Sequence, residues 1–196
     1  MTDLILIVIS YLLGSFPSAL VIGKLIYHKD IRNYGSGNLG STNAFRVLGK
    51  TGGSIVFFLD FFKGGLAVLL ALAFGIHLHP LVISIFALIG HIYPIFANFK
   101  GGKAVASAAG IILFYSPILF IVLLIIFIIT LKIWKMVSLS STIISIATIL
   151  LVWLNITSDY DLIAQIMFTI FAILIIIKHI PNYKRILSGT ENKVSF

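Results

Sequence analysis

Three glycines and several small polar residues lie close together in residues 34–46, which read YGSGNLGSTNAFR. Glycine leaves its backbone N–H groups unshielded and reaches conformations that other residues avoid. Successive exposed N–H groups form a concave anion site, and hydroxyl groups and a guanidinium extend it. The stretch therefore predicts a phosphate-binding loop, although a flexible connector between two helices is the alternative. The residues of the predicted site are Gly35, Ser36, Gly37, Asn38, Gly40, Asn43 and Arg46.

Two nucleotide-binding signatures resemble this loop, and neither fits it. Gly35, Gly37 and Gly40 match G-x-G-x-x-G, but that pattern indicates dinucleotide binding only after a strand, and an apolar helix is predicted before it. The G-x-x-x-x-G-K-[ST] pattern fails because Ser41 stands at the lysine position. The loop is thus predicted to be an anion site of another kind.

Two further basic or charged groups follow along the chain. Lys100, Gly101, Gly102 and Lys103 repeat the combination of open backbone and cations, although an ordinary positively charged loop would look the same. Asp60 and Lys63 are three residues apart in an apolar stretch and so share one helix face. Because charges inside a membrane are costly, we expect them to pair and face the protein interior, either as a structural or as a functional pair.

The C-terminal tail carries the remaining polar candidates. His179 and Asn182 open it, and Arg185 and Glu191 follow. Ser138 and Ser141 begin an earlier apolar stretch, where they either support the site or satisfy neighbouring helices. No set of residues has the spacing of metal ligands, so no metal and no cofactor are predicted.

The composition indicates a membrane protein. The 196 residues are 60% hydrophobic, whereas soluble domains contain about 45–50% apolar residues. We predict an all-α integral membrane protein formed by one domain over residues 1–196. The sequence has no cysteine, which excludes disulfides and thiolate chemistry. Its net charge of +8 fits basic cytoplasmic loops better than nucleic-acid binding.

Seven apolar stretches predict seven transmembrane helices, and the fourth is short for a full crossing. Their ranges are 4–25, 53–74, 81–99, 104–115, 118–134, 138–156 and 162–177, with a polar loop over 26–52. With the N-terminus outside, all fourteen Lys and Arg except Lys63 fall in or beside cytoplasmic segments. This asymmetry follows the positive-inside rule and predicts a cytoplasmic C-terminus. Both glycine stretches, Ser138–Ser141 and the tail would then meet at the cytoplasmic surface.

Three segments in this order resemble a known family. They read GSGNLGSTNAFR, KGGK and HIPNYKRILSGTE, and the whole chain is similar in order and spacing to the bacterial acyl-phosphate:glycerol-3-phosphate acyltransferase (PlsY) family. The resemblance implies transfer of a fatty acyl group from acyl phosphate to glycerol 3-phosphate, giving lysophosphatidic acid and phosphate. This is the first step of phospholipid synthesis, and it implies a bacterial plasma-membrane enzyme with no nucleic-acid partner and no obligate protein partner.

The chemistry of the residues agrees with that reaction. Both substrates carry phosphate, and an activated acyl phosphate needs no covalent intermediate, which fits the absence of cysteine. The His-x-x-x-x-Asp signature of other acyltransferases is absent. A transporter or flippase for a phosphorylated compound is the alternative, but the sequence shows no inverted repeat. The arginine-rich motifs of a lipid phosphatase are not evident.

The catalytic residues are predicted to be His179, Asn182 and Ser36. A base must lie within hydrogen-bond reach of the attacking hydroxyl, and His179 is on the expected face. His91 is a weaker candidate, and Pro181 is expected to end the helix that holds His179. A phosphate oxygen of bound substrate is the alternative proton acceptor, with the protein supplying position and charge neutralisation. We favour this second route, because the candidate site is rich in phosphate binders and poor in bases.

Overall fold

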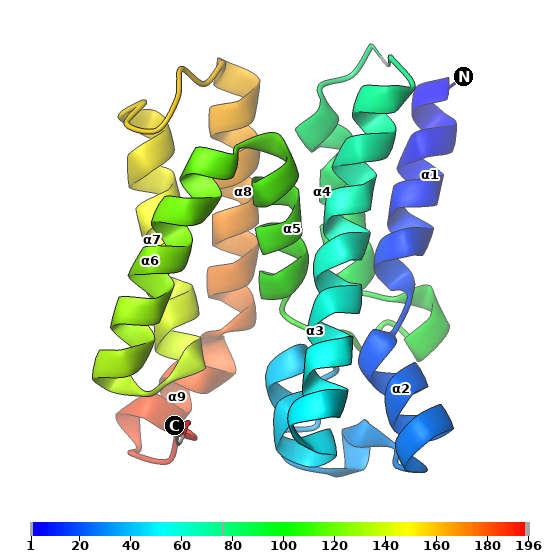
Figure 1. The fold of residues 1–196 in the computed structure, drawn as a ribbon, viewed down its shortest axis with the longest axis vertical. Helices are drawn as coiled ribbons and strands as arrows, with labels where there is room; N and C mark the ends of the chain where they lie inside the picture. Colours follow the sequence, from blue (N-terminus) through cyan, green and yellow to red (C-terminus); the bar gives the residue numbers. More distant parts are fainter. Residues whose placement is uncertain (1, 76, 195–196) are drawn as a thin grey trace. The chain divides into compact units, whose positions relative to one another are not determined.

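The computed structural model describes residues 2–75 and 77–194, and its regular elements there are all helical (Figure 1). The chain divides into two compact units, residues 1–115 and 116–196. We describe each by itself. The first contains α1 (Thr2–Ser15), α2 (Ser18–Tyr27), η1 (Ile31–Asn33), α3 (Ser41–Ala73), α4 (Pro80–Ile92), η2 (Ile95–Ala97) and α5 (Val105–Tyr115). The second contains α6 (Pro117–Trp134), α7 (Val137–Trp153), α8 (Leu162–Lys178) and α9 (Ile180–Leu187).

Glycines bring the helices of the first unit close together. A Cβ atom on Gly14 would overlap the carbonyl of Ala87, so α1 and α4 touch through their backbones. A Cβ atom on Gly64 would overlap the Ser107 carbonyl, and one on Gly110 would overlap the Phe61 carbonyl. Close contact between small residues is how membrane helices gain packing energy without a hydrophobic driving force. The contacts of Gly64 and Gly110 fix α3 against α5, and the contact of Gly14 fixes α1 against α4.

The segment between α2 and α3 is anchored by its apolar residues. Ile31 and Leu39 are buried together with Ala44, Leu48 and Val56 of α3. Ile31 precedes the glycine stretch and Leu39 lies between Gly37 and Gly40, so burying them fixes that stretch against the helices. The glycine loop is therefore held on a core and is not a flexible connector.

The helix α3 begins earlier than the sequence predicted. The polar loop was expected over residues 26–52, but the structure is helical from Ser41, and only a kink at Gly49 interrupts it, with φ of 75°. Ala44 and Leu48 are four residues apart and lie buried on one helix face. This short amphipathic turn packs against the core instead of remaining in solvent, which the overall polarity of the stretch obscured.

Prolines lie at two other helix boundaries. The span predicted over residues 81–99 stops being α-helical at Ile92, just before Pro94, because the residue preceding a proline disfavours helical geometry. Pro181 was expected to end the helix that leads to His179, and α8 does end at Lys178 with His179 as its C-cap. Pro181 itself lies in the first turn of the next helix, α9. Proline is well tolerated there because the first N–H groups of a helix lack partners anyway. The chain bends by 48° between α8 and α9 and continues as helix.

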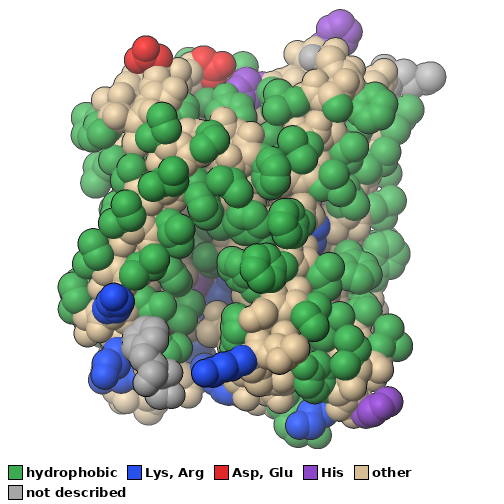
Figure 2. Space-filling model, viewed as in Figure 1, with side chains coloured by type: hydrophobic (Ala, Val, Ile, Leu, Met, Phe, Trp, Pro, Cys, Tyr) green, Lys and Arg blue, Asp and Glu red, His purple; other side chains and the backbone are tan. Residues whose placement is uncertain are grey.

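All seven stretches predicted as spans contain helix, but their lengths differ. Three helices are long and apolar enough to cross a membrane, or up to five if each bent pair counts as one span. The pairs are α1 with α2 and α8 with α9, whereas α5 and α7 are shorter apolar helices. Figure 2 shows hydrophobic side chains over the visible surface of α6, where isoleucines such as Ile121 and Ile125 are exposed. The all-helical membrane class is confirmed, and seven crossings remain a prediction.

Candidate active site

The first glycine stretch is shaped by the side chain of Asn43. Its Oδ1 accepts a hydrogen bond from the Ser36 N–H at 2.9 Å, and its Nδ2 donates to the carbonyls of Tyr34 and Asn38 at 3.2 and 3.1 Å. Asn43 is only 1% exposed, so these bonds are shielded from water. Gly35 has φ of 61°, and a Cβ atom there would overlap Asn43 Oδ1. A glycine at that position is therefore required by both backbone and space.

Some of the N–H groups expected to face an anion are already used. The Ser36 N–H bonds to Asn43, and the Gly37 N–H donates to the Tyr34 carbonyl at 3.0 Å. The open donors are instead at the start of α3, where Gly40 is the N-cap and makes no side-chain capping bond. The first N–H groups of a helix lack intrahelical acceptors and carry its partial positive charge. The beginning of α3 is thus the part of this loop best suited to an anion.

Two of the side chains predicted to bind an anion are exposed on this loop and the first turns of α3. Ser36 is exposed on the loop, and Arg46 is exposed one helical turn after Thr42. A second arginine, Arg32, is engaged elsewhere, because its guanidinium forms a bidentate pair with Asp30 at 2.6 and 2.9 Å. Those side-chain hydrogen bonds hold the pKa of Asp30 well below its usual range. This ion pair was not predicted, although the sequence places opposite charges two residues apart, at Asp30 and Arg32.

The second glycine stretch is a compact turn seated on α4. The Gly102 N–H donates to the His91 carbonyl at 3.0 Å, and a Cβ atom on Gly101 would overlap the same carbonyl. Gly102 therefore contributes close packing, whereas Lys100 and Lys103 supply the cations. Phe99 and Ala104, on either side of the stretch, both have left-handed φ values, of 57° and 62°.

The predicted pairing of Asp60 with Lys63 is confirmed. Lys63 Nζ lies 2.8 Å from Asp60 Oδ1, and the two side chains are 8% and 1% exposed. Sequence analysis missed that His91 belongs to this cluster, with its Nδ1 3.6 Å from Asp60 Oδ1. It also missed Ser18, whose hydroxyl donates to Asp60 at 2.8 Å. One small cavity in the first unit is lined by Ser18, Leu39, Asp60, Lys63, His91, Gly101 and Gly102, among others.

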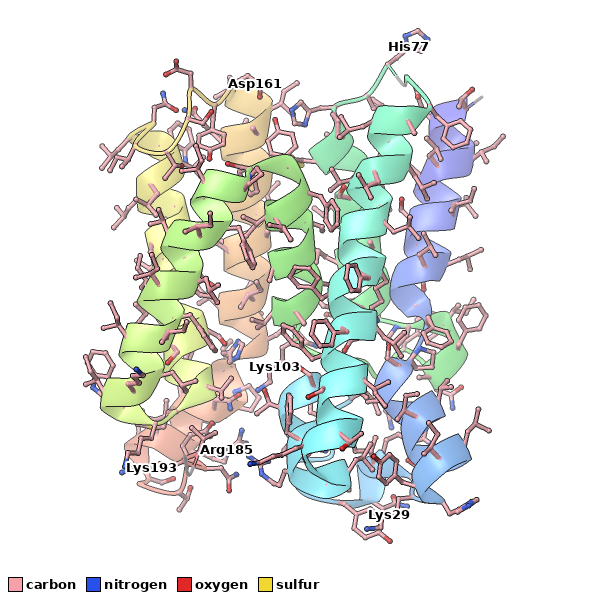
Figure 3. All side chains as sticks on the ribbon, viewed as in Figure 1. Lys29, His77, Lys103, Asp161, Arg185 and Lys193 are labelled. Atoms are coloured by element: carbon pink, nitrogen blue, oxygen red, sulfur yellow. The ribbon has the colours of Figure 1, made fainter. Side chains whose placement is uncertain are left out.

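In the second unit, Glu191 collects three of the predicted residues. Its Oε1 accepts hydrogen bonds from Ser138 Oγ and Asn182 Nδ2, both at 2.7 Å, and its Oε2 accepts from Arg185 Nε at 2.8 Å. Burial alone would raise the pKa of Glu191, but these three hydrogen bonds and the Arg185 charge outweigh it and lower the pKa. Glu191 therefore remains a carboxylate that orients its donors. Arg185 lies at the end of this unit opposite Asp161 (Figure 3).

His179 and Ser141 are the two remaining candidates of the second unit, and each bonds to a backbone carbonyl. His179 is 3% exposed, and its Nδ1 lies 2.8 Å from the Ile175 carbonyl, which requires a proton on Nδ1. In the neutral ring Nε2 is then the basic nitrogen. Ser141 Oγ donates to the Val137 carbonyl within its own helix at 2.8 Å. Among the residues described, no group of three or more His, Asp or Glu side chains could hold a metal ion.

Apolar helices whose connecting segments carry glycines, lysines and arginines are features of an integral membrane protein. The chain belongs to the glycerol-3-phosphate acyltransferase family, whose model matches residues 4–189. It is 46% identical to the glycerol-3-phosphate acyltransferase of Bacillus subtilis, over 98% of this chain and 97% of that protein. It is 47% identical to glycerol-3-phosphate acyltransferase 2 of Bacillus anthracis, over 98% and 99% of the two chains.

Two solved structures resemble the whole chain. Both are crystal structures of PlsY, an integral membrane glycerol 3-phosphate acyltransferase. The glycerol 3-phosphate form has a TM-score of 0.92 and 36% identity, and the lysophosphatidic acid form has a TM-score of 0.89 and 34% identity. Each comparison covers 100% of this chain and 96% of the other. The family resemblance inferred from the three motifs is confirmed.

Proposed function

We propose that this protein transfers a fatty acyl group to glycerol 3-phosphate and so makes lysophosphatidic acid in the membrane. The observation that carries the proposal is the full-length similarity to glycerol-3-phosphate acyltransferases, which include solved forms with this substrate and with lysophosphatidic acid. The family model spans both structural units, which supports one activity shared by the chain as a single domain. Family membership favours an enzyme over the transporter or flippase alternative.

The acyl donor in this proposal is acyl phosphate. The glycerol 3-phosphate hydroxyl oxygen bonds to the acyl carbonyl carbon, the bond from that carbon to the phosphate oxygen breaks, and inorganic phosphate leaves. An acyl phosphate is already activated, so no enzyme nucleophile is needed, and the chain contains no cysteine for a thioester intermediate. Two separate groups of anion-binding residues in the first unit, at the start of α3 and at residues 100–103, suit two phosphorylated substrates.

The roles of the residues follow from their surroundings. The start of α3, Ser36 and Arg46 bind a phosphate, with Gly35, Gly37, Asn38 and Gly40 shaping the loop and Asn43 holding it. Lys100 and Lys103 bind phosphate beside the turn formed by Gly101 and Gly102. In the second unit, Glu191 presents Ser138, Asn182 and Arg185, and Ser141 supports α7. This assignment uses charge-assisted hydrogen bonds, which are the strong ones for phosphate.

The proton of the attacking hydroxyl goes to a substrate phosphate oxygen in the mechanism that we favour. His179 Nε2 is the alternative acceptor, because Nδ1 already carries its proton toward Ile175. In the favoured route, His179 and Asn182 orient the glycerol 3-phosphate, and the cations neutralise the charge that develops on the leaving phosphate. The protein then contributes position and electrostatics instead of a base.

The orientation in the membrane completes the proposal. Seven crossings with the N-terminus outside place both glycine stretches and the tail on the cytoplasmic side, where glycerol 3-phosphate is available. Each unit separately supports this polarity. In the first, Lys29 lies at the end opposite His77, and in the second, Arg185 and Lys193 lie at the end opposite Asp161 (Figure 3).

The experiment that tests the function uses purified protein in lipid vesicles with palmitoyl phosphate as donor. We expect release of inorganic phosphate and formation of lysophosphatidic acid only when glycerol 3-phosphate is present. Palmitoyl-coenzyme A in place of palmitoyl phosphate should give no product. Phosphate release without glycerol 3-phosphate would indicate a hydrolase, and product formed from the coenzyme A ester would refute the assignment of the donor.

A further inference from the structure

A buried ion pair spans the break between α1 and α2. Lys63 Nζ donates to the Phe16 carbonyl at 2.9 Å, directly after the last residue of α1. Asp60 Oδ1 accepts from the hydroxyl of Ser18, the first residue of α2, at 2.8 Å. The ammonium thus lies at the partially negative end of one helix, and the carboxylate lies at the partially positive start of the next. The pair stabilises a break that bends the chain by 42°.

The same ion pair is joined to the second glycine stretch through His91. His91 Nδ1 lies 3.6 Å from Asp60 Oδ1 and 3.3 Å from Ser107 Oγ. On its other side, the His91 ring is packed against the backbone of Gly102, because a Cβ atom there would overlap His91 Nε2. The His91 carbonyl also accepts the Gly102 N–H. The location of this turn is therefore set by His91, which is itself held by Asp60 and Ser107.

The arrangement is costly for a purely structural contact. Asp60 is 1% exposed, and its Oδ2 has no hydrogen-bond partner among the described residues. A buried acceptor without a donor destabilises the folded state. Well-packed apolar residues often hold helices together as well as a buried ion pair does. Asp60, Lys63 and His91 line one cavity with Gly101 and Gly102, so the polar cluster lies directly against a turn assigned to substrate binding.

We propose that Asp60, Lys63 and His91 are positioning residues for the acyltransferase reaction. They hold the turn at Gly101 and Gly102 at a fixed place, so that Lys100 and Lys103 meet the phosphate of the substrate in one geometry. None of the three needs to touch the substrate. The proposal rests on the proposed role of residues 100–103 in phosphate binding. It adds that buried side chains of α3 and α4 determine where those residues lie.

The test compares steady-state kinetics with thermal stability for variants of the cluster. Asp60→Asn and His91→Leu should raise KM for glycerol 3-phosphate or for acyl phosphate by about tenfold or more, since small misplacements of binding groups have effects of that size. The value of kcat should change less, because the chemical groups remain. His91→Gln, which keeps a hydrogen-bonding group at this place, should recover most of the lost affinity.

A double variant separates charge pairing from simple loss of stability. Asp60→Asn with Lys63→Met leaves no unpaired charge, so its melting temperature should exceed that of either single variant. Its KM should nevertheless stay raised, because the turn has lost its support. Recovery of both melting temperature and KM in the double variant would show a structural pair only and overturn the proposal.

Two further variants keep this inference separate from the proposed function. Ser84→Ala removes a buried hydroxyl that bonds to Pro80 at the far end of α4, and it should leave KM unchanged. Lys103→Met tests the phosphate role directly. An unchanged KM in Lys103→Met would overturn the assignment of residues 100–103, whereas a raised KM there with normal values in Asp60→Asn and His91→Leu would overturn the positioning role alone.

Discussion

Arg46 is the residue on which the proposed phosphate site at the start of α3 most depends. A charge-assisted hydrogen bond to phosphate contributes about 1.5–3 kcal/mol, so Arg46→Ala should lower kcat/KM roughly tenfold to over a hundredfold. Arg46→Lys should also be poor, because lysine lacks the planar fork of the guanidinium. The measurement is acyl transfer by purified protein at several glycerol 3-phosphate concentrations.

The matched control for this substitution is Lys50→Ala. Lys50 is a second exposed cation one turn further along α3, beyond the kink at Gly49. Its removal tests for a general effect of surface charge and should change kcat/KM little. Equal losses in the two alanine variants would mean that Arg46 acts through long-range attraction and not through a specific contact.

His179 decides between the two routes for the proton. In the substrate-assisted route the ring orients substrate, so His179→Gln, which can still form hydrogen bonds, should retain measurable turnover. His179→Ala should lose more activity, because the hydrogen bond to the Ile175 carbonyl and the proposed contact with the substrate both disappear. If the two variants are equally inactive while glycerol 3-phosphate still binds, the ring is the base, and the substrate-assisted route is wrong. Binding is measured by calorimetry on the same preparations.

The lowered pKa of Glu191 predicts that the stability of the fold depends on pH. Its pKa in the folded protein is lowered, so its ionised form stabilises the fold above its ordinary pKa, and that contribution is lost as the pH falls through the folded value. Glu191→Gln should therefore lower the melting temperature at pH 7, and the difference from the unmodified protein should shrink at acidic pH. A difference that is constant down to pH 3 would show that the carboxylate charge contributes nothing.

At the scale of elements, the contact between α3 and α5 depends on glycines. Gly110→Ala would place a Cβ atom against the Phe61 carbonyl, and overpacking of this kind costs about 1–3 kcal/mol. Alanine favours helix over glycine by about 1 kcal/mol, so the two effects oppose each other. We expect a lower melting temperature in detergent, because the close approach is of backbone to backbone. A higher melting temperature would show that the helices can separate without loss.

Ala109→Val is the control for that substitution. Ala109 is the neighbouring residue of α5 and is only partly buried, so a larger side chain has room there. Its melting temperature should stay close to that of the unmodified protein.

The helices and the separate site residues were largely predictable from the sequence, whereas their connections were not. Apolar length located all seven stretches, and the spacing of Asp60 and Lys63 indicated their pairing. The helical start of α3 was missed because its amphipathic turn is short and polar on average. The bond of the Ser36 N–H was missed because it depends on the Asn43 side chain, seven residues further along the chain. His91 joins Asp60 only through the packing of α4 on α3, which no local pattern shows.

At the scale of the whole molecule, the orientation in the membrane decides which compartment supplies the substrate. The sequence has no cysteine, so single cysteines can be introduced without background labelling. Ser158 and Asn192 are both exposed and lie on opposite sides of α8 in the chain. In intact cells, Ser158→Cys should react with a membrane-impermeant maleimide, and Asn192→Cys should react only after the membrane is opened. Both variants should keep acyltransferase activity, because neither residue is placed in the site. The reverse labelling pattern would put the basic ends of the helices outside, where glycerol 3-phosphate made in the cell could not reach them, and would contradict the proposed cytoplasmic site.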